Sequence, residues 1–173
     1  MTPAAPHRNL VLIGMPGSGK STVGVLLAKA ANRRFVDTDV LIQAQEGRSL
    51  QSIINAEGLE AFKQIEERYV AGLELAGHVI ATGGSVIYSE KAMAHLRAGG
   101  LVVHLALPLE LVERRITNLY HRGLVMEAGQ TLAGLYRERE PLYRRWAEAT
   151  VACEGLSQEQ VVDEILAIAR RTG

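Results

Sequence analysis

The sequence lacks several features that define other classes of protein. Cys153 is the single cysteine among 173 residues, so no internal disulfide can form, and no paired cysteine and histidine spacing indicates zinc. Basic and acidic residues balance at 19 each, so no overall field favours nucleic acid or an anionic membrane. We therefore expect a reduced, cytoplasmic protein that binds neither of them.

Long apolar runs are missing as well. No stretch approaches the roughly 18 apolar residues of a membrane span, and residues 1–8 contain two prolines but no apolar segment of signal-peptide length. We expect residues 1–8 to form a flexible tail. Residues 9–173 suffice for one domain with a hydrophobic core, which we expect to act as a monomer.

A phosphate loop is the strongest feature that the sequence does contain. Residues 14–21 read Gly-Met-Pro-Gly-Ser-Gly-Lys-Ser and fit the template of Gly, four residues, Gly, Lys, then Ser or Thr. Glycines without Cβ let the backbone N–H groups curl around an anion, and the N-terminus of the following helix adds partial positive charge. We expect Lys20 to reach the outer phosphates and the Ser21 hydroxyl to ligate Mg²⁺. The predicted nucleotide-binding residues of this segment are Gly17, Ser18, Gly19, Lys20, Ser21 and Thr22.

Short apolar strands alternate with helical patterns along the chain, which is typical of a three-layer α/β fold, a parallel sheet with helices on both faces. The predicted strands span residues 10–13, 35–36, 78–81, 101–107 and 150–153. The predicted helices span residues 22–31, 50–56, 59–75, 89–97, 108–117, 131–146 and 157–171. Ser49 is an expected N-cap. Residues 119–130 have weak periodicity and two glycines, and we expect them to form a mobile lid.

Acidic residues follow the second predicted strand, at the edge where ligands of open α/β sheets bind. Asp37 and Asp39 are two apart and point to the same side at a strand end, so that one suits Mg²⁺ and one can take a proton from an acceptor hydroxyl. The third strand ends in residues 82–85, Thr-Gly-Gly-Ser, without the second metal carboxylate usual in phosphate-loop enzymes, and we expect Asp37 to replace it. The alternatives are a helix N-cap at the aspartates and a plain tight turn at the glycines.

Arginines gather in the later part of the chain. Phosphoryl transfer needs positive charge on the developing oxygens, and a mobile lid that brings in one arginine and excludes water would supply it. For any single arginine, the alternative is a solvated helix face. The candidates are Arg114, Arg115, Arg122, Arg137, Arg139, Arg144 and Arg145.

Together these motifs resemble the shikimate kinases, small phosphate-loop kinases with the nucleoside monophosphate kinase fold. The resemblance runs from about Asn9 to the terminal helix. It implies five parallel strands in the order 2-3-1-4-5, ATP and Mg²⁺ as cofactors, and substrate-binding helices within residues 38–75. It is carried by residues 14–22, 36–39 (Val-Asp-Thr-Asp), 62–67 (Phe-Lys-Gln-Ile-Glu-Glu), Gly83, Gly84, Arg122 and 139–143 (Arg-Glu-Pro-Leu-Tyr).

On the nucleotide side, the resemblance implies that Asp37 acts on Mg²⁺ through water and that Arg115 lies beside the adenine. Arg122 is then the lid arginine that reaches the phosphates and stabilises charge there together with Lys20. The sequence departs from the family at the lid, which usually reads Arg-Pro. Here Gly123 follows Arg122, and glycine loosens what proline would stiffen.

On the acceptor side, the resemblance implies that Asp39 holds hydroxyls and acts as base, while position 63 and Arg139 bind a carboxylate. The family has arginine where this chain has Lys63, a point charge without the bidentate grip of arginine. The third glycine of the family's triplet is Ser85, which is expected to narrow the pocket or add a hydroxyl contact. The implied substrate-binding set is Asp39, Lys63, Gly83, Gly84, Ser85 and Arg139.

The sequence therefore predicts an ATP-dependent kinase for a hydroxyl of a small, carboxylate-bearing acceptor. The resemblance makes this acceptor shikimate, in aromatic amino acid biosynthesis. The alternatives are another hydroxy acid such as homoserine or a sugar acid, a nucleoside monophosphate acceptor, and a nucleotide-binding regulatory module. The guanine-reading pattern Asn-Lys-x-Asp is absent from the sequence, which argues against a GTPase.

Overall fold

The computed structural model describes residues 8–116, 126 and 129–172. Its centre is a five-stranded parallel sheet in the order β2-β3-β1-β4-β5, which confirms the order that the resemblance implied. Each strand begins and ends within a residue of its predicted position. The strands are β1 (Asn9–Ile13), β2 (Arg34–Asp37), β3 (His78–Ala81), β4 (Gly100–Ala106) and β5 (Ala149–Ala152).

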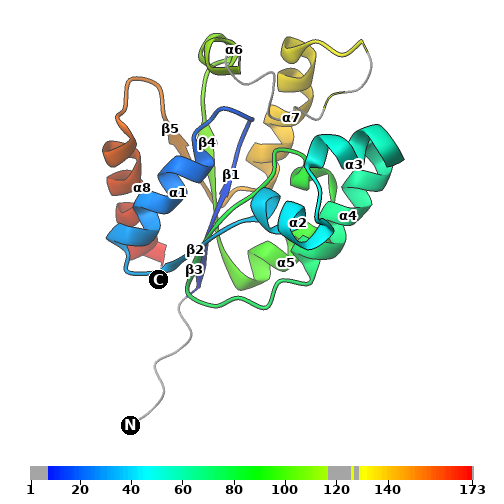
Figure 1. The fold of residues 1–173 in the computed structure, drawn as a ribbon. Coiled ribbons are helices and arrows are strands. Elements are labelled where there is room, and N and C mark those ends of the chain that lie inside the picture. The colour runs from blue at the N-terminus through cyan, green and yellow to red at the C-terminus, as the bar shows by residue number, and fades with distance from the viewer. Residues whose placement is uncertain (1–7, 117–125, 127–128, 173) are drawn as a thin grey trace.

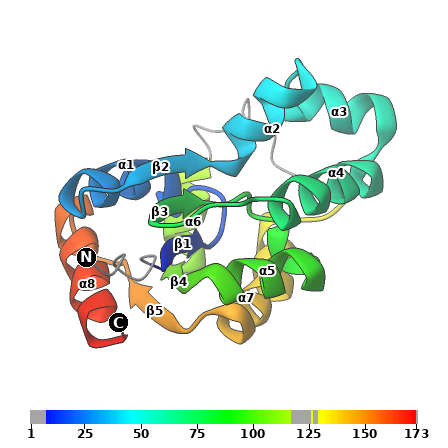
Figure 2. The same ribbon diagram turned by 90° about the horizontal axis from the view of Figure 1, so that it is seen from below.

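Helices cover both faces of the sheet, as predicted (Figure 1). Seen from below, α1 and α8 lie side by side on one face, while α5 and α7 lie on the other (Figure 2). None of the helices among the described residues is long and apolar enough to cross a membrane. The helices are α1 (Lys20–Ala30), α2 (Thr38–Glu46), α3 (Leu50–Glu57), α4 (Leu59–Ala71), α5 (Glu90–Gly99), α6 (Leu109–Ile116), α7 (Leu132–Trp146) and α8 (Gln158–Thr172), with a short 3₁₀ helix η1 (Val86–Tyr88).

The central strand β1 is buried along its whole length, between β3 and β4. A continuous apolar run suits a strand that helices cover on both faces. Leu12 and Ile13 have no exposed surface, and burying such a side chain stabilises the fold by about 1.5–3 kcal/mol. Since the phosphate loop follows Ile13 directly, the rigid centre of the core fixes where the loop begins.

A second, smaller core lies outside the sheet, where α2, α3 and α4 meet. Its buried members come from all three helices and form a cluster separate from the main core. This core fixes the face of α4 that carries Lys63 and Glu66, in the region predicted to bind substrate. The buried members are Ile42, Leu50, Ile53, Phe62 and Ile65.

Several local predictions can be compared with the structure. Ser49 is the N-cap of α3, and its side chain accepts a hydrogen bond from the Ser52 amide at 3.1 Å, as expected. The helix predicted over residues 59–75 was too long, because α4 ends at Ala71 with Gly72 as its C-cap. The apolar pattern continues because Leu75 packs against the main core from an extended connection. Helix η1 was not predicted.

The predicted tail falls mostly outside the described residues. Arg8, its last residue, is described and contacts the body of the protein. Its Nη2 donates to the Gly100 carbonyl at 2.9 Å, and its own carbonyl accepts from Arg33 Nη1 at 2.5 Å.

Candidate active site

The phosphate loop connects β1 to α1 at the carboxyl edge of the sheet. Gly14 has a φ of +151°, and a Cβ at this position would lie 2.8 Å from the Leu105 carbonyl oxygen, so a side chain does not fit. Gly19 has a φ of +94° and leads directly into α1. The loop therefore turns tightly against β4 and directs the N-terminus of α1 toward the cleft, where an anion can bind.

Lys20 lies across the loop rather than out in solvent. Its Nζ donates to the carbonyl oxygens of Gly14 and Met15 at 2.8 and 2.9 Å. Burial lowers the pKa of Lys20 to about 8, although the charge of Asp39 opposes this shift. The ammonium is thus held at the loop by two neutral acceptors, and a phosphate oxygen would be a stronger partner.

Ser21 and Asp37 face each other across the start of α1 and the end of β2. Ser21 Oγ donates to Asp37 Oδ2 at 2.5 Å, while Asp37 Oδ1 accepts from the amides of Asp39 and Val40 at 3.0 and 3.3 Å. Asp37 is thus the N-cap of α2, as the alternative reading expected, and one of its oxygens also faces the phosphate loop.

A hydroxyl and a carboxylate are oxygen donors of the kind that Mg²⁺ prefers. Ser21 and Asp37 therefore fit such an ion chemically. The described residues contain no group of three or more histidine, cysteine, aspartate or glutamate side chains suited to a metal. An ion here would need its remaining ligands from phosphate oxygens and water.

The other predicted nucleotide residues lie around the same loop. Ser18 is buried, and its Oγ has no hydrogen-bond partner among the described residues. Arg115, on α6, donates from Nη1 to the Gly17 carbonyl at 3.2 Å. Thr22 is exposed in the first turn of α1. Arg122 and most of the predicted lid, residues 119–130, lie outside the described residues.

Asp39 stands at the start of α2, between the phosphate loop and the end of β3. Burial raises the pKa of its carboxyl to about 6, Asp37 adds to the rise, and Lys20 opposes it. The preceding residue ties the two strand ends together, because Thr38 Oγ1 accepts a hydrogen bond from the Gly83 amide at 3.1 Å. Asp39 and Gly83 therefore lie close together at neighbouring strand ends, as the strand-end rule predicts, although 44 positions separate them in the sequence.

Gly83 and Gly84 allow other groups to approach the backbone closely. A Cβ on Gly83 would lie 2.4 Å from Glu66 Oε1 and 2.7 Å from Asp39 Oδ1. A Cβ on Gly84 would lie 2.9 Å from Arg139 Nη1. The glycines are required because side chains from α2, α4 and α7 converge on them, which goes beyond the alternative of a plain tight turn.

Glu66 is a prominent group in this region that was not predicted as a site residue. Its carboxylate accepts a hydrogen bond from Ser85 Oγ to Oε2 at 2.5 Å, and both side chains are buried. Oε1 has no hydrogen-bond partner among the described residues. Burial raises the pKa of Glu66 to about 7, against the hydrogen bond from Ser85. The signal in the sequence was its place three residues after Lys63, on the same face of one helix.

The Ser85 hydroxyl is therefore used within the protein. It was expected to narrow the pocket or to contact the substrate. Instead it is 4% exposed and donates to Glu66. The hydroxyl thus helps to hold the Glu66 side chain in the pocket wall.

Lys63 and Arg139 meet at the ring of Tyr88. Lys63 Nζ lies 5.0 Å from the ring centroid, and the guanidinium carbon of Arg139 lies 5.4 Å from it. Arg139 is 1% exposed and also donates from Nε to Tyr88 Oη at 3.3 Å. Lys63 forms a further ion pair with Glu60 at 2.7 Å. The two cations expected to bind a carboxylate thus contact the same ring.

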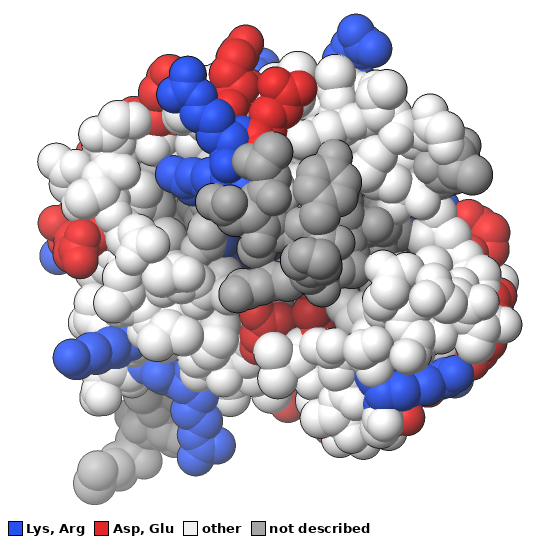
Figure 3. Space-filling model, turned by 45° about the horizontal axis from the view of Figure 1, so that its top comes forward, with Lys and Arg blue, Asp and Glu red and all other residues white. Residues whose placement is uncertain are grey.

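Two other candidate arginines lie on the surface. Arg144 and Arg145 are exposed and pair with Glu140 and Glu90 at 2.8 and 3.0 Å. The alternative of a solvated helix face therefore fits both. The carboxyl edge of the sheet is different, because acidic side chains lie there inside a hollow of the molecular surface (Figure 3).

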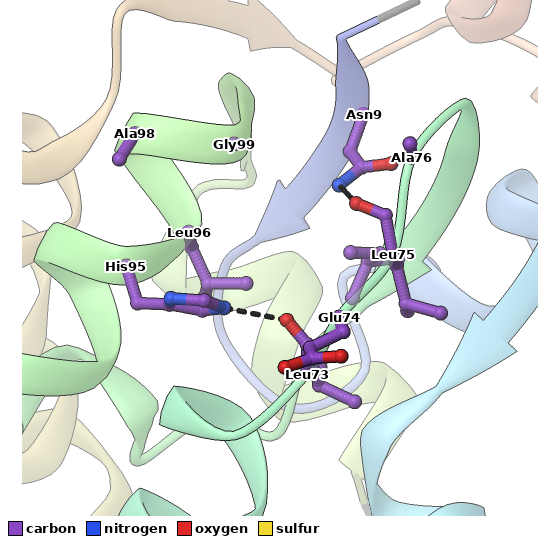
Figure 4. A pocket seen from close by; sticks show the side chains of 10 residues that line it. Asn9, Leu73, Glu74, Leu75, Ala76, His95, Leu96, Ala98 and Gly99 are labelled. Atoms are coloured by element: carbon purple, nitrogen blue, oxygen red, sulfur yellow. Dashed lines mark hydrogen bonds between the residues drawn. The ribbon is translucent and has the colours of Figure 1, made fainter. Parts of the chain in front are cut away.

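Another hollow, of about 460 Å³, lies at the opposite edge of the sheet, beside the start of β1 (Figure 4). Two of its polar side chains, those of Asn9 and His95, are paired with backbone groups. Asn9 donates to the Leu75 carbonyl and accepts from the His78 amide, both at 2.8 Å, and His95 Nε2 lies 2.6 Å from the Leu73 carbonyl oxygen. These bonds join the loop before β3 to the core, so we place the active site at the carboxyl edge.

A parallel sheet in this strand order, with a phosphate loop after its central strand and carboxylates at the end of β2, defines a phosphate-loop kinase. Comparison with known proteins identifies the family within this class. A family model described as shikimate kinase matches residues 16–170. The chain belongs to the shikimate kinase family, phosphotransferases that act on a hydroxyl group with ATP as phosphate donor.

Individual relatives agree over most of their length. The chain is 38% identical to a shikimate kinase of Pseudomonas entomophila, over 92% of this chain and 94% of the relative. It is 41% identical to one of Thiobacillus denitrificans, over 83% and 80%. The solved structure of shikimate kinase from Acinetobacter baumannii in complex with shikimate matches with a TM-score of 0.88 at 31% identity, over 95% of this chain and 94% of that one.

Proposed function

We propose that this protein transfers the γ-phosphoryl group of ATP to a hydroxyl of shikimate, as a step of aromatic amino acid biosynthesis. The observation that carries the proposal is the position of Asp39. This carboxylate lies between the lysine of the phosphate loop and the glycine pair at the end of β3, on which Glu66 and Arg139 also converge. The solved relative that contains shikimate supports this acceptor.

The nucleotide side would be formed by residues 17–22 together with Arg115. In the proposed complex, Lys20 leaves the loop carbonyls and donates to the outer phosphates, where its charge stabilises the transferred group. Ser21 and Asp37 would hold Mg²⁺, which would neutralise negative charge of the phosphates when bound. Arg122 is the lid arginine of this proposal.

On the acceptor side, Asp39 would orient the reacting hydroxyl and take its proton. A carboxylate whose pKa is raised to about 6 is a better base near neutral pH than an ordinary aspartate. The Gly83 and Gly84 backbone lets the acceptor lie close to this carboxylate. Lys63 and Arg139 would bind the acceptor's own carboxylate, and Ser85 would act through Glu66.

A steady-state assay of ADP release with a panel of acceptors tests the proposal. Turnover should require shikimate, whereas homoserine, a sugar acid and a nucleoside monophosphate should give only the background rate. Preferred turnover of another panel member would replace shikimate with that acceptor. If ATP binds and no acceptor stimulates ADP release, the kinase assignment is wrong and a regulatory module is the better interpretation.

The proposal also takes the enzyme to be a cytoplasmic monomer, and the single cysteine fits a reduced compartment. Light scattering of the purified protein, with and without ATP and shikimate, measures the mass directly. A mass of about 19 kDa in both conditions agrees with a monomer of this chain, whose mass is 18.8 kDa.

A further inference from the structure

Lys63 is a weak carboxylate ligand unless something holds its head in place. Its ammonium ends a flexible stem and offers a point charge without the rigid fork of arginine. The ion pair with Glu60 contributes little, because the Glu60 side chain is 78% exposed and water screens the pair. The ammonium also lies over the Tyr88 ring, at 5.0 Å from the centroid.

The Tyr88 ring is itself firmly placed. It ends η1, directly after Ile87, whose carbonyl accepts a hydrogen bond from Trp146 Nε1 at 3.1 Å. Its hydroxyl accepts from Arg139 Nε at 3.3 Å and donates to Glu138. Helix α7 therefore holds both the backbone beside Tyr88 and the tip of its side chain.

Two cations share this ring. A cation within about 6 Å of an aromatic centroid is attracted by the ring quadrupole, and both Lys63 and Arg139 meet this condition. The three side chains also line one small hollow between α4 and α7, whose lining includes Leu135 and the carboxylate of Glu138. The ring thus brings a mobile ammonium beside a buried guanidinium, although like charges repel each other.

We propose that Tyr88 is a positioning residue that sets the specificity for carboxylate-bearing acceptors, because its ring holds Lys63 beside Arg139 so that both cations meet one carboxylate. This inference rests on the proposed function, in which these two cations bind the acceptor. It explains how the site works with lysine at position 63. Because the ring holds the ammonium in place, it supplies part of the rigidity that an arginine fork would provide.

The test compares the kinetics of the full-length protein with those of Tyr88→Leu and Tyr88→Phe. Losing the ring should raise KM for shikimate about tenfold, with kcat and the KM for ATP nearly unchanged. The phenylalanine variant keeps the π face, and its KM should stay within about threefold of the wild type. With the methyl ester of shikimate, which lacks the charge, Tyr88→Leu and the wild type should have the same KM.

A double variant separates placement of Lys63 from a general effect on the fold. Lys63→Arg should lower KM for shikimate by a larger factor in Tyr88→Leu than in the wild type, since the arginine fork needs the ring less. Tyr69→Leu is the matched control, because Tyr69 also carries a cation, Arg68, at 5.1 Å from its ring. It should leave KM for shikimate unchanged. Tyr88→Met, which has bulk but no π face, carries the test if the leucine variant does not fold.

The outcomes distinguish this inference from the proposed function. No turnover of any carboxylate acceptor by the wild type would overturn both. Wild-type turnover of shikimate with an unchanged KM in Tyr88→Leu would overturn the inference alone. The same holds if KM rises equally for shikimate and its methyl ester, or if Lys63→Arg lowers KM by the same factor with and without Tyr88, because the ring then does not place Lys63.

Discussion

The buried carboxyl of Glu66 predicts how the stability of the ligand-free protein depends on pH. Its side chain is 2% exposed, and Oε1 has no hydrogen-bond partner among the described residues. Burial raises its pKa from 4.5 to about 7. Glu66→Gln replaces the carboxyl with a neutral amide of the same shape, whose carbonyl can still accept the hydrogen bond from Ser85.

The direction of the pH dependence follows from which state, folded or unfolded, holds the Glu66 proton more tightly. The folded state keeps the Glu66 proton up to about pH 7, whereas the unfolded state loses it near pH 4.5. The stabilisation from this group is therefore complete below about pH 4.5 and is lost as the pH rises toward 7. A shift of this size corresponds to about 3 kcal/mol. The wild type should lose about that much more stability than Glu66→Gln between about pH 4 and pH 8.

Thermal unfolding without ligands measures this difference. For a domain of this length, about 3 kcal/mol corresponds to roughly 6–12 °C in Tm. The difference in Tm between Glu66→Gln and the wild type should grow in favour of the variant as the pH rises from about 4 to about 8. The exposed Glu74 provides the control variant, Glu74→Gln, for the loss of one carboxyl. If the difference in Tm between Glu66→Gln and the wild type does not change with pH, burial does not raise the pKa of Glu66 in the folded protein.

Three further substitutions test the proposed roles by activity. Lys20→Ala should lower kcat by about 100-fold or more while circular dichroism stays unchanged, and near-normal turnover would remove Lys20 from the mechanism. Gly83→Ala places a Cβ 2.4 Å from Glu66 Oε1; it should lower kcat/KM for shikimate about 100-fold with ATP binding retained, and an unaffected kcat/KM would contradict it. Lys63→Arg should lower KM for shikimate several-fold through a bidentate grip, whereas worse turnover would indicate a different acid.

The sheet could be predicted because apolar runs report burial directly. Each strand is short, apolar and bounded by a turn, and the phosphate loop fixes which strand is central. The strand-end rule then brought Asp37, Asp39 and Gly83 together from distant positions. The same logic failed at the end of α4, because Leu75 is apolar for contact with the core and not as part of a helix.

The acceptor wall could be predicted only in part, because its contacts join side chains from separate elements. Ser85 and Glu66 lie 19 positions apart, and neither position predicts a bond to the other. Tyr88 lies on a single turn of 3₁₀ helix, which is too short to give a periodic signal. Its contact with two cations depends on how α4 and α7 are placed, which composition and spacing do not reveal.

The two acceptor-side departures from the family pattern therefore cannot be judged one position at a time. Ser85 uses its hydroxyl on Glu66, and Lys63 rests on the ring of Tyr88, so each unusual residue has a partner in the same wall. Returning either position to the family residue changes the surroundings of its partner as well. Ser85→Gly would remove the one hydrogen bond that Glu66 has among the described residues, and a buried carboxyl without partners is costly. The wall is better understood as two coupled pairs, and double-mutant cycles across each pair measure that coupling.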